Sequence, residues 1–375
     1  MKKVMIFYGS YGGGHLSAAK SIKEYLENNY PDIEIQMIDC IEYVNKVVNK
    51  ITTKAYSELV KNASWAWGFV YKKSEHGPIA KISNNSNKIM SIKLNKLIKK
   101  NNPDIVISTH PFSSQMCAYL KKKHKINFKL ATIITDYALH EQWLLYHEEV
   151  NYYFVAYEKL KNDLIESGIS SDTIFSTGIP VSGKFLKKYN NEEILKEFNL
   201  LPNKKNILFF AGGEYGLGKN KTFEIFKILA ENFNDIQIIA IAGKNEEMKN
   251  KFIKLVEHTK REDAIKVLEF TDKVAEIMSI SNLVITKPGG LTTTESLVSG
   301  LPIIAINPIP GQEENNAKFI EKNNVGIWLK KDDNIFTVLS NIINDNEKLE
   351  MYKKNTKLIS KIDSTENICK IIIEK

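Results

Sequence analysis

A glycine turn that leads into a helix with an acidic residue is the part of this sequence best suited to chemistry. The run Leu283–Ile285 is typical of a buried parallel strand, Pro288–Gly290 of a tight turn, and the residues from Thr292 onward of a helix. The N–H groups of a first helical turn and the helix dipole both favour a bound diphosphate. Glu295 lies about one helical turn further on, where a carboxylate can accept from sugar hydroxyls. The pattern predicts a nucleotide-sugar site, and an ordinary strand-to-helix turn is the alternative.

A second glycine-rich turn opens the chain. The strand-like run Val4–Tyr8 leads into residues 9–15, GSYGGGH, and then into a helical pattern from Leu16. Consecutive glycines let the backbone approach a ligand closely. His15 follows them at the carboxyl end of a predicted strand, where open α/β sheets bind their ligands. A lone histidine is more often a surface or capping residue, but at this place its ordinary pKa of about 6.5 suits a general base.

The elements that must position these residues alternate between strand and helix along both halves of the chain. The length of 375 residues predicts two domains of roughly 150 to 200 residues each, with a linker near residues 183–204. The alternation predicts an α/β fold with doubly wound parallel sheets, and residues 334–375 are expected to be helical. The expected strands are Val4–Tyr8, Glu34–Ile38, Ile105–Ser108, Leu130–Thr135 and Tyr153–Ala156, then Asn206–Ala211, Gln237–Ala242, Ile265–Glu269, Leu283–Thr286 and Pro302–Ile306.

Positive charge is concentrated in one segment. The net charge is +8, and residues 46–100 hold twelve lysines and two glutamates, a local net charge of +10. Aromatic rings beside lysines suit an anionic membrane surface, whereas nucleic-acid readout usually relies on arginine and the chain has only Arg261. A lysine-rich bias on solvated helices is the alternative. The candidate membrane and acceptor residues are Trp65, Trp67, Phe69, Tyr71, Lys72 and Lys73.

Several classes of protein are disfavoured by composition. No apolar run approaches the ~18 residues of a membrane span, and no secretory signal is visible, which predicts a cytoplasmic protein. The three cysteines, Cys40, Cys117 and Cys369, lie too far apart in sequence for a zinc or disulfide pattern and are expected to be reduced. No Asp-x-Asp motif occurs, so we expect no metal and no other cofactor, with the helix N-terminus neutralising a leaving diphosphate.

Short motifs follow one another in a fixed order along nearly the whole chain. They are GGGH at 12–15, STHPF at 108–112, TDY at 135–137, TGIP at 177–180, GG at 212–213, KPGG at 287–290, TTTE at 292–295 and PGQE at 310–313. In this order they resemble the GT-B glycosyltransferases of family 28 that make glycolipids from diacylglycerol. These are the bacterial diacylglycerol glucosyltransferases and the plant monogalactosyldiacylglycerol synthases. The peptidoglycan N-acetylglucosaminyltransferase is a more distant relative.

The resemblance implies two Rossmann-like doubly wound domains facing a central cleft. Residues 1–190 would bind the lipid acceptor and the membrane, residues 191–345 would bind the UDP-sugar, and residues 346–375 would form a helical segment that packs back on the first domain. The implied activity is an inverting, metal-independent transfer of glucose or galactose from the UDP-sugar to diacylglycerol. The protein would act while peripherally bound to the cytoplasmic face of the cell membrane.

The resemblance also assigns residues. His15 would contact the reacting centre as general base or as hydrogen-bond donor, with Asp136 as the competing base. Glu295 would hold the uridine ribose, and Gln312 and Glu313 would contact the hexose hydroxyls. The full set implied for the UDP-sugar is Gly13, Gly14, Gly212, Gly213, Gly243, Phe270, Thr271, Gly290, Thr292, Thr293, Glu295, Gln312, Glu313 and Asn316, with Phe270 and Thr271 beside the uracil.

Some positions depart from the family pattern. Many members have a basic residue where this chain has Glu141, and Arg-Pro where it has Ser182-Gly183. One alternative is a transferase acting on an isoprenoid-linked acceptor, which usually carries two glutamines where this chain has Gln312 and Glu313. An epimerase of UDP-sugars on the same scaffold is another. A protein of a different class would bind nucleotide or lipid without catalysis.

Overall fold

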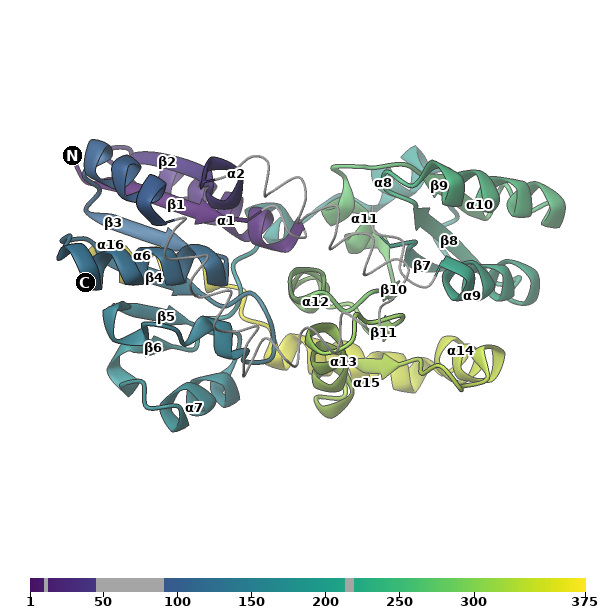
Figure 1. The fold of residues 1–375 in the computed structure, drawn as a ribbon. Helices are drawn as coiled ribbons and strands as arrows, with labels where there is room; N and C mark the ends of the chain where they lie inside the picture. Colours follow the sequence, from purple (N-terminus) through teal and green to yellow (C-terminus); the bar gives the residue numbers. More distant parts are fainter. Residues whose placement is uncertain (10–12, 45–90, 213–218) are drawn as a thin grey trace. The chain divides into compact units, whose positions relative to one another are not determined.

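Two six-stranded sheets, each with all strands parallel, organise the described part of the chain. The computed structural model describes residues 1–9, 13–44, 91–212 and 219–375 (Figure 1). These residues divide into two units. The first contains the described residues up to Gly183 together with Lys361–Lys375, and the second contains the described residues of Lys184–Ser360.

The sheet of the first unit has the order β2-β1-β3-β4-β5-β6. Its strands are β1 (Lys3–Tyr8), β2 (Glu34–Asp39), β3 (Ile105–Ser108), β4 (Lys129–Ile133), β5 (Tyr152–Phe154) and β6 (Ile174–Phe175). Its helices are α1 (Gly13–Asn29), α2 (Cys40–Val44), α6 (Pro111–His124), α7 (Glu158–Glu166) and α16 (Ser364–Glu374); residues 91–101 are also helical. Aliphatic side chains of β1, β3 and β4 pack against α1 and α16 to form one core.

The sheet of the second unit has the order β12-β11-β10-β7-β8-β9. Its strands are β7 (Lys205–Phe210), β8 (Ile236–Ile241), β9 (Ile265–Leu268), β10 (Leu283–Thr286), β11 (Ile303–Ala305) and β12 (Gly326–Trp328). Its helices are α8 (Asn191–Glu197), α9 (Lys219–Asn232), α10 (Glu246–Thr259), α11 (Val274–Ile280), α12 (Gly290–Val298), α13 (Gln312–Lys322), α14 (Ile335–Ile343) and α15 (Asn346–Ile359). The rings of Phe226 and Phe252 stack at 3.8 Å in its core.

In each sheet, the order of the strands reverses at the first strand of the unit. β1 pairs with β2 on one side and β3 on the other, and β7 pairs with β8 on one side and β10 on the other. In doubly wound sheets, ligands bind outside the carboxyl ends of the strands at such a switch point. The topology therefore predicts ligand contacts from the segments after β1 and β3 in the first unit, and from those after β7 and β10 in the second.

The last helix of the chain returns to the first unit. Ile368, Cys369 and Ile372 of α16 are buried in the core of that unit. The hydroxyl of Thr365 accepts from Val181 N at 3.1 Å and donates to Val181 O at 2.8 Å. These bonds connect the segment just before residue 183 with the segment just after residue 360, which are the two points where the described part of the chain passes from one unit to the other.

The observed division lies at 183 and 360, whereas the expected boundaries lay at 190 and 345. The residues of α15 therefore stay in the second unit, because Leu349 and Tyr352 pack into its core. Of the C-terminal segment 346–375, only the residues from 361 onward belong to the first unit.

Each strand expected from the sequence overlaps an observed strand, and two more are present. β6 and β12 are only two and three residues long, and each pairs with one neighbour at an edge of its sheet. α12 begins at Gly290, two residues before the expected start. All three cysteines are buried free thiols. Among the described helices, none has the length and apolar character needed to cross a bilayer.

Candidate functional site

His15 is held by the segments that follow three strands of the first unit. It lies in the first turn of α1, and its Nδ1 is 2.6 Å from the carbonyl oxygen of Thr109 and 3.0 Å from the hydroxyl of Thr135. Thr109 follows β3, and Thr135 follows β4 closely. The Thr109 hydroxyl in turn donates to the His15 carbonyl at 2.9 Å. The switch point of the sheet therefore fixes the place of this imidazole.

These contacts assign the tautomer of His15. A carbonyl oxygen only accepts hydrogen bonds, so Nδ1 of His15 must carry a hydrogen to bond Thr109. In the neutral ring, Nε2 then holds the lone pair. The hydrogen bond made by Nδ1 therefore determines that Nε2 is the nitrogen able to accept a proton.

A second histidine packs against the first. The His110 ring lies edge-on to His15, with 4.6 Å between centroids and 70° between ring planes. His110 Nδ1 accepts from the backbone N–H of Phe112 at 3.2 Å, where it caps the start of α6. The sequence motif STHPF gave no role for this histidine, and its place beside His15 follows from the pairing of β1 with β3.

Burial changes the basicity expected for His15. Desolvation lowers its pKa to about 4, although the hydrogen bond to Thr109 opposes that shift. Burial also lowers the pKa of His110 well below its ordinary value, and the neighbouring His15 adds to the effect. The expectation that His15 keeps a pKa near 6.5 is therefore wrong for the ligand-free protein. Its imidazole is neutral at pH 7, which leaves Nε2 able to accept a proton.

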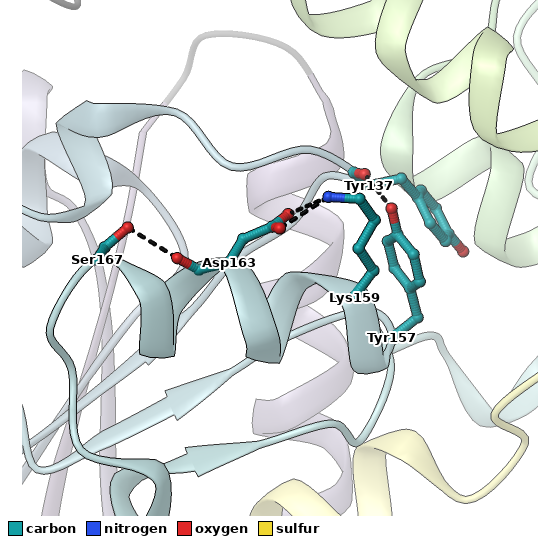
Figure 2. A network of polar contacts seen from close by, with 5 residues as sticks. All are labelled: Tyr137, Tyr157, Lys159, Asp163 and Ser167. Atoms are coloured by element: carbon teal, nitrogen blue, oxygen red, sulfur yellow. Dashed lines mark hydrogen bonds and ion pairs between the residues drawn. The ribbon is translucent and has the colours of Figure 1, made fainter.

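Asp136, the competing base, is only 6% exposed and lies beside Thr135. The next residue, Tyr137, is anchored from α7: the hydroxyl of Tyr157, the N-cap residue of α7, donates to the Tyr137 carbonyl at 3.2 Å (Figure 2). Along α7, Lys159 pairs with Asp163 at 2.7 Å, and Ser167 donates to the Asp163 carbonyl (Figure 2). The Tyr157 hydrogen bond anchors the chain at Tyr137, two residues after the hydroxyl that contacts His15.

The second unit carries the phosphate-type turn at the end of β10. Gly289 is the N-cap of α12, and Thr293 N is bonded back to the Gly289 carbonyl at 2.9 Å. The N–H groups of Gly290, Leu291 and Thr292 therefore precede the helical hydrogen-bond ladder and are available to an anion. Thr292 keeps exposed surface, whereas Thr293 is fully buried. Of these two expected contact residues, Thr292 is therefore the one with surface open to a ligand.

Glu295 lies further along α12, and its carboxyl group is largely desolvated by the surrounding protein. Its side chain keeps some exposed surface, yet burial of the carboxyl raises its pKa to about 8. At pH 7 in the ligand-free protein the group is therefore mostly protonated. A neutral carboxyl both donates and accepts, which suits a pair of neighbouring sugar hydroxyls.

Helix α13 is fastened to the same turn by two contacts. The amide of Asn316, which is fully buried, donates to the Pro288 carbonyl at 2.9 Å. Glu313 Oε1 lies 3.1 Å from Lys287 Nζ, and its Oε2 accepts from Ile309 N at 2.7 Å. Asn316 thus supports the turn. The sequence interpretation missed Lys287 as a partner of Glu313, although both follow neighbouring strands, β10 and β11.

The other residues expected to contact the UDP-sugar follow strands or begin helices in the two units. Gly13 and Gly14 begin α1, and Gln312 begins α13. Gly212 and Gly243 lie two residues after the ends of β7 and β8, with φ of 89° and 62°, which glycine adopts more easily than other residues. Phe270 is 71% exposed, and the hydroxyl of Thr271 accepts from Lys273 N before α11. Gly213 and the membrane candidates Trp65, Trp67, Phe69, Tyr71, Lys72 and Lys73 lie outside the described residues.

The chain matches two family models that together span most of it. Residues 15–181 match the monogalactosyldiacylglycerol (MGDG) synthase model, and residues 206–368 match the glycosyltransferase family 28 C-terminal domain. The described part of the chain contains no cluster of three or more potential metal ligands among its His, Cys, Asp and Glu side chains.

Solved structures share the fold at low sequence identity. MurG of Acinetobacter baumannii matches with a TM-score of 0.63 and 14% identity over the full length of both chains. A complex of Staphylococcus aureus MnaA with UDP matches with a TM-score of 0.65 and 15% identity, over 98% of this chain and 95% of that one. These likenesses establish the fold as GT-B.

Curated relatives align over the whole chain. The processive diacylglycerol beta-glucosyltransferase of Bacillus pumilus is 30% identical over 100% of this chain and 95% of its own length. The protein of the same name from Staphylococcus aureus is 31% identical over 100% of this chain and 93% of its own length. The chain belongs to the diacylglycerol β-glucosyltransferase family of GT-B glycosyltransferases.

Proposed function

We propose that this protein transfers glucose from UDP-glucose to diacylglycerol, with inversion at the anomeric carbon, to give a β-glucosyl lipid. The full-length similarity to proteins named diacylglycerol beta-glucosyltransferases supports the donor sugar and the acceptor. The observation that carries the chemistry is the geometry of His15, whose Nδ1 is committed to Thr109 and whose Nε2 is left as the basic nitrogen.

In this mechanism Nε2 of His15 takes the proton of the acceptor hydroxyl as that oxygen attacks the anomeric carbon. The Thr109 carbonyl, 2.6 Å from Nδ1, stabilises the imidazolium that forms, because it accepts from the ring N–H. The Thr135 hydroxyl, 3.0 Å from Nδ1, supports the same orientation. The carbon–oxygen bond to the diphosphate breaks in the same displacement, and UDP leaves.

The donor is proposed to bind to the second unit without a metal. The N–H groups at the start of α12 face the diphosphate, and Glu295 holds the ribose. The lack of an Asp-x-Asp motif in the sequence supports the metal-free reaction. We further propose that the protein binds the membrane surface through the aromatic and lysine residues of the segment 65–73.

Radiolabelled UDP-glucose and UDP-galactose, offered in parallel with diacylglycerol in liposomes and EDTA, test this proposal. A labelled glycolipid formed preferentially from UDP-glucose is the expected product, and chromatography also counts the sugars added. Loss of product in EDTA that returns with Mg²⁺ would contradict the metal-free mechanism. Absence of any labelled lipid from either donor would overturn the assignment of the acceptor.

A further inference from the structure

We propose that Lys287 and Glu313 form an ion pair that opens when the donor binds, so that the lysine passes to the diphosphate and the carboxylate to the hexose. This inference rests on the proposed function, since it describes the same donor site. It adds a catalytic residue, Lys287, and a link between the two ends of the donor.

The position of Lys287 points to the diphosphate. It directly follows β10 and precedes the turn whose end starts α12. Its side chain is 22% exposed, so the ammonium is held close to the protein rather than extended into water. None of the residues expected to contact the UDP-sugar carries a positive charge, and a cation would add to the stabilisation that the helix dipole gives a leaving diphosphate.

Both carboxylate oxygens of Glu313 already have a protein partner in the ligand-free protein. Its Oε1 pairs with Lys287 at 3.1 Å, its Oε2 accepts from Ile309 N at 2.7 Å, and the side chain is 12% exposed. Ile309 N belongs to the backbone, and Ile309 itself is buried, so this partner stays. The lysine ammonium sits on a flexible stem and is the partner that can leave.

The turn keeps its shape when the pair opens. Asn316, which is fully buried, holds the Pro288 carbonyl at 2.9 Å independently of Lys287 and Glu313. The same helix, α13, thus supplies a fixed contact and an exchangeable one. A diphosphate carries more negative charge than one carboxylate and forms charge-assisted hydrogen bonds, so it competes for the ammonium.

Titration calorimetry of UDP and UDP-glucose on the full chain tests the exchange. Lys287→Gln is expected to weaken UDP binding by roughly tenfold or more, the loss typical of a charge-assisted hydrogen bond. Glu313→Gln is expected to strengthen UDP binding about threefold or more, because Lys287 loses the carboxylate that competes with the phosphate. The same Glu313→Gln change should reduce the preference for UDP-glucose over UDP.

The double variant Lys287→Gln/Glu313→Gln tests whether Glu313 affects UDP binding through Lys287 or only supports the local structure. If Glu313 acts through Lys287, the gain from Glu313→Gln should vanish in the Lys287→Gln background. Lys287→Arg should retain UDP binding, which guards against a folding defect in the glutamine variant. As controls, Lys251→Gln and Glu247→Gln remove an exposed pair on α10 with a similar separation of 2.9 Å, and should leave UDP affinity unchanged.

Opposite signs for the two single variants would support the exchange. Equal weakening of UDP binding by both would make the pair a structural clamp and overturn it, as would unchanged affinity in Lys287→Gln. If the unmodified protein bound neither UDP nor UDP-glucose, the proposed function itself would fail along with the exchange.

Discussion

Replacement of Glu295 by glutamine should stabilise the protein in a pH-dependent way. Burial raises the pKa of this carboxyl from 4.5 to about 8, with no opposing contribution from a charged partner. In the unfolded chain the group ionises near its ordinary value. Between these two values the folded protein binds the proton more strongly than the unfolded chain, so the free energy of unfolding falls as pH rises.

The size of this effect follows from the two pKa values. Below about pH 4.5 both states are protonated and Glu295 costs nothing, and above about pH 8 the full cost is present. That cost is at most ~5 kcal/mol, and water entering around the ionised carboxylate reduces it. Glutamine has nearly the same shape and no charge, so the variant avoids the penalty. At about 2 to 4 °C per kcal/mol, the variant should melt at least ~5 °C higher at pH 9.

Scanning calorimetry at pH 5 and pH 9, without ligand, measures the difference. Glu295→Gln should match the unmodified protein closely at pH 5 and exceed its Tm at pH 9. Glu257→Gln is the matched control, because this glutamate is exposed on α10 of the same unit. An equal Tm difference at both pH values would refute the argument, since the carboxyl would then ionise alike in the folded and unfolded states.

Three further predictions concern other parts of the chain. His15→Ala should abolish transfer and retain UDP affinity; in the unmodified protein kcat/KM should show no acid limb from His15 near pH 6.5, because burial lowers that pKa to about 4. Gly326→Ala should destabilise the protein by about 2 kcal/mol or more in urea unfolding, because its Cβ would lie 1.8 Å from the Ile303 carbonyl oxygen, whereas Gly183→Ala, with no atom within 4 Å, should not. Replacing Trp65, Trp67 and Phe69 by serine should reduce sedimentation with anionic liposomes at unchanged UDP affinity, and equal sedimentation would contradict the docking role.

The sequence predicted most of the described strands because they lie within apolar runs. β8, for example, is buried along its whole length, and such a run is typical of a strand covered on both faces. β6 and β12 were missed because each is a short edge strand with only two large apolar side chains. β12 begins with Gly326, which pairs with Ile303 at the edge of the sheet, so its existence depends on the neighbouring strand.

The candidate site was predictable where side chains carry the signal. The glycine turns, His15 and Glu295 have recognisable types and spacing. The partner of His15 is a backbone carbonyl, that of Thr109, which has no signature in sequence. The approach of Lys287 to Glu313 requires the adjacency of β10 and β11, which follows only from the strand order. The pKa shifts of His15 and Glu295 arise from burial, which residue spacing in the sequence does not predict.

The shifted groups share one physical cause that bears on mechanism. Desolvation keeps His15 neutral by lowering its pKa and Glu295 neutral by raising its pKa, while the partly buried Lys287 and Glu313 neutralise each other as an ion pair. The ligand-free protein thereby avoids the cost of unpaired buried charge. Under the proposed function, each group would meet a new charged or proton-donating counterpart only when a ligand binds: a diphosphate for Lys287, an acceptor hydroxyl for His15. Under the proposed function, these electrostatic interactions would be strongest in the reacting state, which is where they would accelerate the transfer.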